Sequence, residues 1–403
     1  MTDPQALADR VADGELRLHE LEDYADADAA AEARRRFLAQ TTGTAFDHVG
    51  GYGFAAADAT AAIENLVGAA QVPMGVAGPV TVHGAAADGE YYLPLATTEG
   101  ALVASVNRGL GILRASGGAT ARVVESKMTR APVFRTDGVA ASVALADWAR
   151  DHVGTLAEAA EATTSHGELL DVTPFVVGEN VFLRFAYDTK DAMGMNMATI
   201  ATKAACEVVE AETDASLVAL SGNLCTDKKP AAIDAVTGRG RTVAADVRVH
   251  RSLVEARLHT TPEAIAEVNE RKNHVGSAKA GSLGFNAQVA NVVAAMFLAT
   301  GQDAAQVVEG ANAITTAGVH DDELYLSVTL ASLEVGTVGG GTRLPTQAEA
   351  LDLLGVRGGG DPPGANADAL AELVAVGALA GECSLLAAMA SRHLASAHET
   401  LGR

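Results

Sequence analysis

Positive charge, aromatic residues and cysteine are all scarce in this chain of 403 residues. Its 29 lysines and arginines are outnumbered by 51 aspartates and glutamates, which gives a formal net charge of −22. This excess excludes nucleic acid as a partner, because little in the chain could neutralise a row of phosphates. The cysteines at 206, 225 and 383 are odd in number and far apart, so we expect neither a disulfide framework nor a thiolate metal cluster.

The chain also lacks a long apolar run that is free of polar residues. The two most apolar stretches, 280–300 and 370–392, contain Asn291 and Glu382, whose side chains would be costly in lipid. We therefore expect both stretches to be buried core helices and expect no membrane association. The first residues are acidic and show no basic segment followed by an apolar one, so we expect no signal peptide and a cytoplasmic location.

What is abundant is small aliphatic and acidic residues. Hydrophobic residues make up 48% of the chain and aromatics only 4%, a composition typical of a globular protein with an Ala/Val/Leu core. Only seven of the basic residues are lysines. An acidic, lysine-poor surface suits molar salt, where the Debye length is about 3 Å and self-repulsion is screened. An ordinary acidic cytosolic enzyme is the alternative.

Hydrophobic periodicity and Gly/Pro punctuation predict several elements in a chain long enough for two or three domains. The expected helices are 4–45, 101–115, 140–162, 191–212, 243–270, 280–300 and 366–399. The expected strands lie within 64–84, 120–136 and 181–189. Residues 132–219 therefore form a compact strand–helix–strand–helix unit in this interpretation.

Two adjacent lysines, Lys228 and Lys229, stand in SGNLCTDKKPAA directly after Asp227. Neighbouring ammonium groups repel each other unless anions bind there, and Pro230 stiffens the loop. The functional interpretation is an electrophilic site for a substrate oxygen and a carboxylate. The alternative is a solvated charged turn.

Three further candidates have simple structural alternatives when each is taken alone. Glu99, in ATTEGALVASVNRG, fits the start of a helix, where the helix dipole favours an acid. Asp303, in GQDAAQ, fits the N-cap of a short helix. His398 fits a solvated histidine, and its spacing of five from His393 excludes a helical metal pair.

The segment DAMGMNM (191–197) follows an expected strand and opens an expected helix. Unpaired N–H groups and the helix dipole make such a position able to bind an anion, and Gly194 would allow a phosphate to approach the backbone. Asp191 fits a simple N-cap equally well. The chain contains no G-x-G-x-x-G, so any dinucleotide would bind outside a Rossmann fold.

Taken together and in order, these segments resemble the 3-hydroxy-3-methylglutaryl-coenzyme A (HMG-CoA) reductase family, in the class shared by eukaryotes and many archaea. The matching segments are ENLVGAAQVPMGVAGP, ATTEGALVASVNRG, MTRAP, DAMGMNM, SGNLCTDKKPAA, KNHVGSAKAGSLGFNAQVANVV, GQDAAQ, GTVGGGT and LASAH. The resemblance implies an α+β fold with a large domain around a long central helix. It further implies a helical N-terminal region (1–67), a large substrate-binding domain (68–131 and 220–403) and an inserted ferredoxin-like NADP-binding domain (132–219).

The resemblance also implies residue roles. The catalytic residues would be Glu99, Lys228, Asp303 and His398. The substrate would be held by Ser105, Asn107, Arg108, Arg130, Ser221, Asp227, Lys229 and Lys272. The dinucleotide would be held by Asp191, Met193, Gly194, Met195 and Asn196. The loop expected to meet the cofactor's 2′-phosphate offers only His166 as a cation, with Ser165 beside it.

The implied reaction is the reduction of HMG-CoA to mevalonate and CoA with two NADPH and no metal, in isoprenoid synthesis. The implied assembly is a homo-oligomer with active sites at a dimer interface. Burial is expected to raise the pKa of Glu99 so that it can deliver a proton. One alternative is an NADH-linked enzyme of the family's other class that oxidises mevalonate, although that class lacks TDKKPAA. The other is a non-catalytic binding relative, although such a protein would be expected to lose Glu99, Lys228 or His398.

Overall fold

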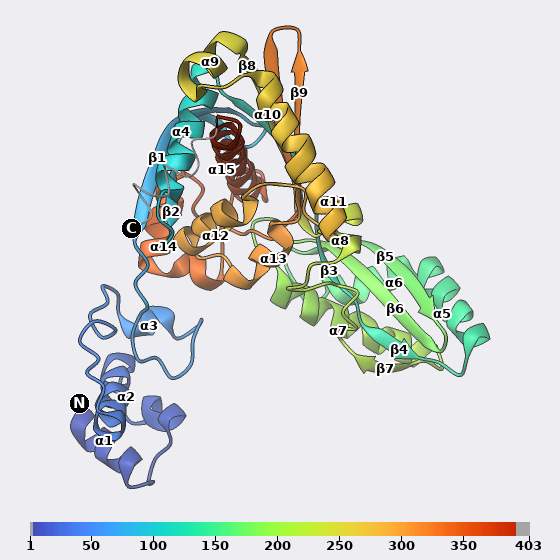
Figure 1. Ribbon diagram of the computed structural model, residues 1–403. Coiled ribbons are helices and arrows are strands. Elements are labelled where there is room, and N and C mark those ends of the chain that lie inside the picture. Colours follow the sequence, from blue (N-terminus) through green and yellow to red (C-terminus); the bar gives the residue numbers. More distant parts are fainter. Residues whose placement is uncertain (1–2, 392–403) are drawn as a thin grey trace.

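A computed structural model of the chain describes residues 3–391 and shows three regions (Figure 1). A helical N-terminal region extends away from the rest of the molecule. A large region surrounds a central helix, and a small region projects from it on the other side. The mixed α+β class expected from the sequence is confirmed.

The N-terminal region consists of short helices rather than one long one. Its elements are α1 (Pro4–Ala12), a 3₁₀ turn (Leu18–Asp23), α2 (Ala27–Thr42) and α3 (Ala56–Ala59). The prediction of a single helix over 4–45 was wrong, because Gly14 adopts a positive φ and Asp26 caps a new helix through the N–H of Ala29. The apolar residues keep a helical spacing through this turn, so the spacing alone did not show where one helix ends and the next begins.

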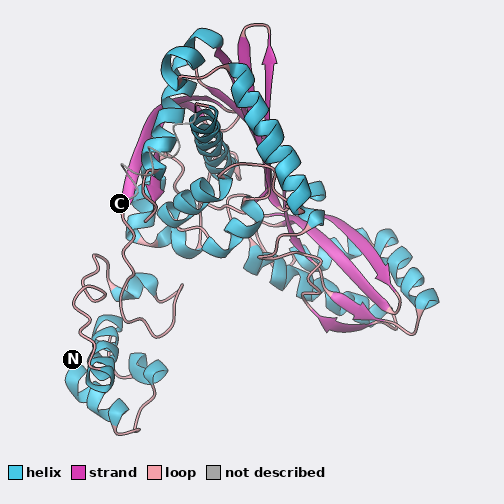
Figure 2. Cartoon of the chain, viewed as in Figure 1, coloured by secondary structure: helices cyan, strands magenta, loops and turns pink. Residues whose placement is uncertain are grey.

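The large region is built on a sheet in which β10, β8 and β3 run side by side and antiparallel. Its strands are β1 (Met74–His83), β2 (Asp88–Ala96), β3 (Ala119–Arg130), β8 (Gly240–His250), β9 (Ala313–His320) and β10 (Glu323–Leu333). Figure 2 shows these strands continuing into the small region. The link is β3, whose last residues pair with β6 (Asn180–Asp188) of the small region.

The central helix α15 (Ala365–Ala390) is almost entirely buried. Among the described residues it is the one helix long and apolar enough to cross a membrane, but most of it lies inside the fold, as a core helix does. Its two buried acids are bound by backbone N–H groups: Glu372 accepts from 85–87, and Glu382 accepts from 287–288. Gly109 allows α4 (Leu102–Ala115) to approach it, since a Cβ there would lie 2.0 Å from the Ala380 carbonyl oxygen.

The small region contains one sheet covered by helices. Its elements are β4 (Val133–Arg135), α5 (Val139–Asp151), α6 (Val153–Glu161), β5 (Glu168–Val177), β6, α7 (Met195–Glu212) and β7 (Ser216–Ala219). The strand order is β7-β4-β6-β5, and every pair is antiparallel. Its apolar core is separate from that of the large region.

The remaining elements surround the large sheet and the central helix. They are α8 (Ala232–Thr237), α9 (Arg251–Leu258), α10 (Pro262–Val268), a π-helical segment (Asn269–Gly276), α11 (Ser277–Ala280), α12 (Val289–Thr300), a 3₁₀ turn (Ala304–Gln306), α13 (Val307–Gly310), another 3₁₀ turn (Gly340–Arg343) and α14 (Pro345–Leu353).

Some predicted helix bounds were wrong in the large region. The helix expected over 243–270 begins only at Arg251, because Val243, Ala245, Val247 and Val249 alternate and point into the core from β8. The helix expected over 280–300 begins at Val289, whereas β1 lies within the stretch 64–84 in which a strand was expected. For 280–300 the loop before α12 was read as helix, whereas for 243–270 most of strand β8 was read as helix.

Candidate active site

The loop that carries the two lysines has a strained backbone. It runs from β7 to α8, and Asn223, Thr226 and Lys228 in it all have positive φ angles. A non-glycine residue rarely adopts this conformation, and a β-branched threonine does so least of all. The loop is tied to the end of β3 by two hydrogen bonds, from the N–H of Gly222 to the Ala131 carbonyl and from the Thr129 hydroxyl to the Cys225 carbonyl.

The side chain of Lys228 is paired with Asp303. Its Nζ lies 2.8 Å from Oδ2 of Asp303, and the lysine side chain remains 44% exposed. The hydrogen bond to Asp303 raises the pKa of Lys228, so the ammonium form persists to higher pH. Asp303 also caps the short 3₁₀ turn that follows it, through the N–H of Ala305, as its structural interpretation expected.

Behind this loop lies a buried cluster around Arg239. Its guanidinium, which is 0% exposed, lies 3.1 Å from Asp227, 3.5 Å from Glu309 and 2.9 Å from Glu334. Burial raises the pKa of Glu334 well above its usual range and also raises that of Glu309. Asp227, expected to hold substrate, is therefore bound from behind by Arg239 and by Gln306.

Two more predicted substrate residues lie beside the lysine loop. Ser221 contacts the thiol of Cys225, and Arg130 ends β3 next to the small region. The Nε of Arg130 is buried and has no hydrogen-bond partner among residues 3–391. An uncommitted guanidinium edge fits a carboxylate ligand. Lys229 directs its Nζ to the carbonyl of Asp227 within the same loop.

Glu99 lies apart from this group within the chain. It is exposed in the turn before α4, and its Oε1 accepts a hydrogen bond of 3.2 Å from Asn291 on α12. The expected burial of Glu99 is therefore not provided by the described residues of one chain. Asn291 lies near the start of α12 and Asp303 just past its end, and a helix of twelve residues measures about 18 Å.

The residues around Glu99 enclose a cavity of about 480 Å³ that Ser105, Arg108 and Asn291 help to line. Ser105 and Arg108 both bind Ser384 on α15, whereas Asn107 accepts from the N–H of Gly78 and faces a different hollow. Lys272 lies in the π-helical segment, where its Nζ donates to the side-chain oxygen of Asn273. Within one chain, Glu99 and the pair of Lys228 with Asp303 thus lie at opposite ends of α12.

The predicted dinucleotide segment opens α7, as expected, but Asp191 has a different partner there. Its carboxylate is buried and accepts N–H bonds from 360, 364, 366 and 367, so it holds the start of α15 rather than the start of α7. Gly194 has φ +89°, and a Cβ there would lie 2.3 Å from Thr189. No described side chain caps α7, which leaves its first N–H groups available to an anion.

The other predicted cofactor residues lie around the same helix end or on a nearby surface. Met193 and Met195 pack against the core of the small region, and Asn196 is exposed. Ser165 and His166 are exposed in the turn before β5. His398 lies outside the described residues. Within residues 3–391 no group of three or more His, Cys, Asp or Glu side chains is placed to hold a metal ion.

Sequence reasoning missed three residues that shape the site: Asn291, Arg239 and Glu309. Asn291 was noted only as a polar residue in an apolar stretch, and its contact with Glu99 joins residues 192 positions apart. The buried ion pairs of Arg239 with Glu309 and Glu334 likewise span 70 and 95 positions. The available signal was a polar or charged residue within an apolar segment. Such a residue does not show which distant residue it contacts.

Comparison with known proteins identifies the family. The family model described as hydroxymethylglutaryl-coenzyme A reductase matches residues 30–403. The chain is 72% identical over 403 residues to the 3-hydroxy-3-methylglutaryl-coenzyme A reductase of Haloferax volcanii, with both chains fully covered. It is 69% identical to the protein of that name from Halobacterium salinarum, covering 100% of this chain and 99% of the relative.

A solved structure shares the fold. It is that of the class II 3-hydroxy-3-methylglutaryl-CoA reductase from Streptococcus pneumoniae bound to NADPH in open conformations, with a TM-score of 0.67. The match covers 96% of this chain and 97% of that one at 21% identity. The chain therefore belongs to the hydroxymethylglutaryl-coenzyme A reductase family of oxidoreductases.

Proposed function

We propose that the chain reduces (S)-HMG-CoA to (R)-mevalonate and CoA with two NADPH, in the mevalonate pathway that supplies isoprenoids for archaeal lipids. The observation that carries the proposal is the ion pair of Lys228 with Asp303 in a loop next to the small region. It provides an ammonium group in the same loop as Ser221, and this loop is tied to the end of β3 that carries Arg130, so a thioester oxygen and a carboxylate could both be bound here. Family membership and the names of the relatives support the same reaction.

Lys228 acts on the oxygen that becomes negative during reduction. Hydride addition to the thioester carbonyl produces a hemithioacetal oxyanion, and a positioned ammonium group stabilises this charge by several kcal/mol, on the order of an oxyanion-hole donor. Asp303 keeps Lys228 protonated and aimed, because its carboxylate raises the lysine pKa and binds the Nζ directly. This pairing serves both reduction steps, since each places negative charge on the same oxygen.

Two further groups move protons. The hemithioacetal expels the CoA sulfur, and His398 is proposed to protonate it, because a free thiol has a pKa near about 8.5 and the neutral thiol is a better leaving group than the thiolate. Glu99 is proposed to deliver a proton to the aldehyde oxygen in the second reduction. Asn291 fixes one of its carboxylate oxygens and leaves the other available.

The small region is proposed to be the NADPH domain. Its elements follow the order β-α-β-β-α-β along the chain if α5 and α6 count as one helical layer. This order and the strand order β7-β4-β6-β5 correspond to the ferredoxin-like arrangement. The uncapped N-terminus of α7 fits a pyrophosphate, and the lack of a side chain at Gly194 lets the backbone there pack against Thr189. When bound, NADPH supplies the hydride. The residues of this chain provide the anion site, and exposed Ser165 and His166 are proposed to meet the 2′-phosphate.

The separation of the two groups along α12 supports a dimer with shared active sites. Within one chain Glu99 and Lys228 are bound to opposite ends of a helix about 18 Å long, too far apart to act on one carbonyl. We therefore propose that Glu99 of one subunit completes the site of Lys228 in a second. A cytoplasmic location is also proposed, and cell fractionation followed by immunoblotting would test it.

The reaction is tested by following nicotinamide absorbance with purified protein and HMG-CoA. We expect consumption of two NADPH for each CoA released, and a higher kcat/KM for NADPH than for NADH. Equal values for the two cofactors would remove the cofactor preference and leave the reaction intact. Failure to oxidise either cofactor in the presence of HMG-CoA, or NAD-dependent oxidation of mevalonate as the faster reaction, would overturn the proposal.

Activity and stability are expected to depend on salt. With a net charge of −22, the folded protein repels itself increasingly as KCl falls from molar to about 0.1 M, where the Debye length reaches about 10 Å. The melting temperature and the turnover should both fall over this range. Sucrose at matched osmolality is the control, because it screens no charge. A melting temperature and turnover that stay constant across the KCl series would refute salt adaptation.

A further inference from the structure

Lys228 has a left-handed backbone conformation within a turn that is closed by a hydrogen bond from the N–H of Lys229 to the Thr226 carbonyl. Its φ is +57°, and Thr226, two residues earlier, has φ +63°. The left-handed region brings the Cβ of an L-residue too close to the following carbonyl, so such residues persist where surrounding contacts hold them. The orientation of the ammonium group depends on this backbone, because the side chain leaves the loop in a direction fixed at the Cα.

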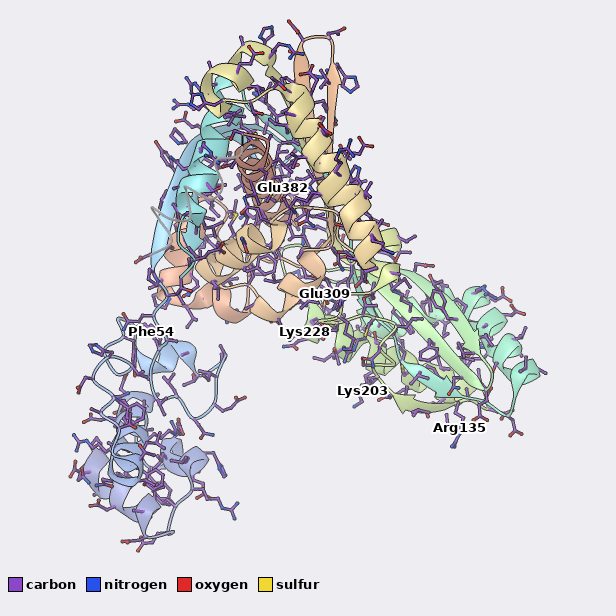
Figure 3. All side chains as sticks on the ribbon, in the orientation of Figure 1. Phe54, Arg135, Lys203, Lys228, Glu309 and Glu382 are labelled. Carbon is purple, nitrogen blue, oxygen red and sulfur yellow. The ribbon has the colours of Figure 1, made fainter. Side chains whose placement is uncertain are left out.

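A contact from outside the loop, made by Glu309, adds to this turn hydrogen bond. One of its carboxylate oxygens, Oε1, accepts hydrogen bonds from the N–H of Lys228 and, at 3.3 Å, from the N–H of Lys229. Glu309 lies on α13 and is 0% exposed. Arg239 lies 3.5 Å from the same oxygen and balances its charge. Figure 3 shows Lys228 and Glu309 together where the large and small regions meet.

Both ends of the lysine are therefore bound by one short stretch of chain. Asp303 forms an ion pair with the Nζ, and Glu309, six positions later, accepts a hydrogen bond from the backbone N–H. The two acids stand on consecutive short helical turns, so the distance between them is set by helical geometry. A shift of either anchor would move the ammonium relative to the substrate oxygen.

We propose that Glu309 is a positioning residue for Lys228, which it holds in the left-handed conformation from which the ammonium reaches Asp303. The role rests on the proposed function, because it matters to turnover only if Lys228 stabilises the oxyanion. Glu309 is buried behind the loop and binds the backbone N–H groups of Lys228 and Lys229. Arg239 also contacts Glu334, but the described contacts of Glu334 include none with Lys228 or Lys229.

The test compares Glu309→Ala with Glu309→Gln. Alanine removes the acceptor, and a misplacement near 1 Å is enough to lower turnover about 100-fold, so we expect kcat to fall by about 10- to 100-fold. The KM for NADPH should stay within about twofold, because no cofactor contact is lost. Glutamine keeps an amide oxygen that accepts the same N–H groups, so it should restore most of the turnover.

The pH profile separates charge from position. The alkaline limb of kcat reports loss of the Lys228 proton, and the negative charge of Glu309 contributes to the raised pKa of that lysine. Glu309→Gln should therefore move this limb to lower pH while turnover at its optimum stays high. The groups that also face this pair are Asp227, Lys229, Arg239, Asp303, Glu334 and Asp234, and all of them remain in both variants.

Glu334→Ala is the matched control, because it removes an equally buried acid from the same arginine without touching the lysine loop. We expect it to keep kcat near the wild-type value even if its melting temperature falls. The role is overturned if Glu309→Ala turns over normally, if Glu334→Ala loses as much turnover, or if glutamine neither rescues kcat nor moves the limb. If Glu309→Ala does not fold, the glutamine variant and its pH profile decide. Wild-type protein that is inactive with HMG-CoA would instead overturn the proposed function.

Discussion

Replacing Lys228 by alanine is expected to lower turnover by at least about 100-fold, with HMG-CoA and with mevaldehyde alike. The magnitude is that of losing an oxyanion donor from a preorganised site. The kcat for both substrates should fall, because each hydride transfer places negative charge on the oxygen that the ammonium faces. The measurement is kcat for each substrate in the purified variant, with its circular dichroism spectrum as the check on folding.

His398→Gln is the contrasting variant in the same experiment. Mevaldehyde has no thiolate to expel, so loss of the proposed thiol acid should slow reduction of HMG-CoA strongly and largely spare that of mevaldehyde. Near-wild-type turnover of Lys228→Ala would refute the oxyanion role. If His398→Gln slows both substrates equally, His398 is not the acid for the thiolate.

Mixing two inactive variants, Glu99→Gln and Lys228→Ala, is expected to restore activity. If each site takes Glu99 from one subunit and Lys228 from the other, a mixed dimer contains one site with both groups intact. One of its two sites is then intact, so the purified mixed dimer should recover about half of the wild-type activity. The reason lies in α12, which separates the contacts of the two residues by its full length.

The matched control mixes Lys228→Ala with Asp303→Ala. These two residues contact each other within one chain, so every site of the mixed dimer lacks one of them and activity should stay low. The variants are co-expressed with different tags, and the doubly tagged dimer is purified and assayed. Recovery in both mixtures, or in neither, would show that Glu99 and Lys228 are not supplied by different subunits.

The residues that could be identified from the sequence are those whose chemistry is visible locally. Two adjacent lysines in a lysine-poor chain indicated an anion site, and the structure places one of them against Asp303. The opening of α7 at Gly194 was likewise visible from neighbouring residues. The apolar stretch ending near 392 was expected to be a core helix, and α15 confirms it.

The missed features depend on contacts between distant parts of the chain. Asp191 was interpreted as a cofactor ligand or a cap of its own helix, yet it binds the start of α15, more than 160 positions away. Glu309 supports a loop 80 positions earlier. The strand β8 was missed because Ala and charged residues between its valines also fit a helix when alternation is not weighed first.

The position of α15 has a consequence for how the protein is made. This helix is the core of the large region, packed against α4 and holding the β1–β2 turn through Glu372, yet it is the last described element to leave the ribosome. At about 5 to 20 residues per second, roughly 15 to 60 s of translation separate β2 from its completion. During that time the apolar faces of β1, β2 and α4 have no central partner, whereas the contiguous small region can already fold. A growing chain is therefore most in need of chaperone protection just before its C-terminal helix is finished.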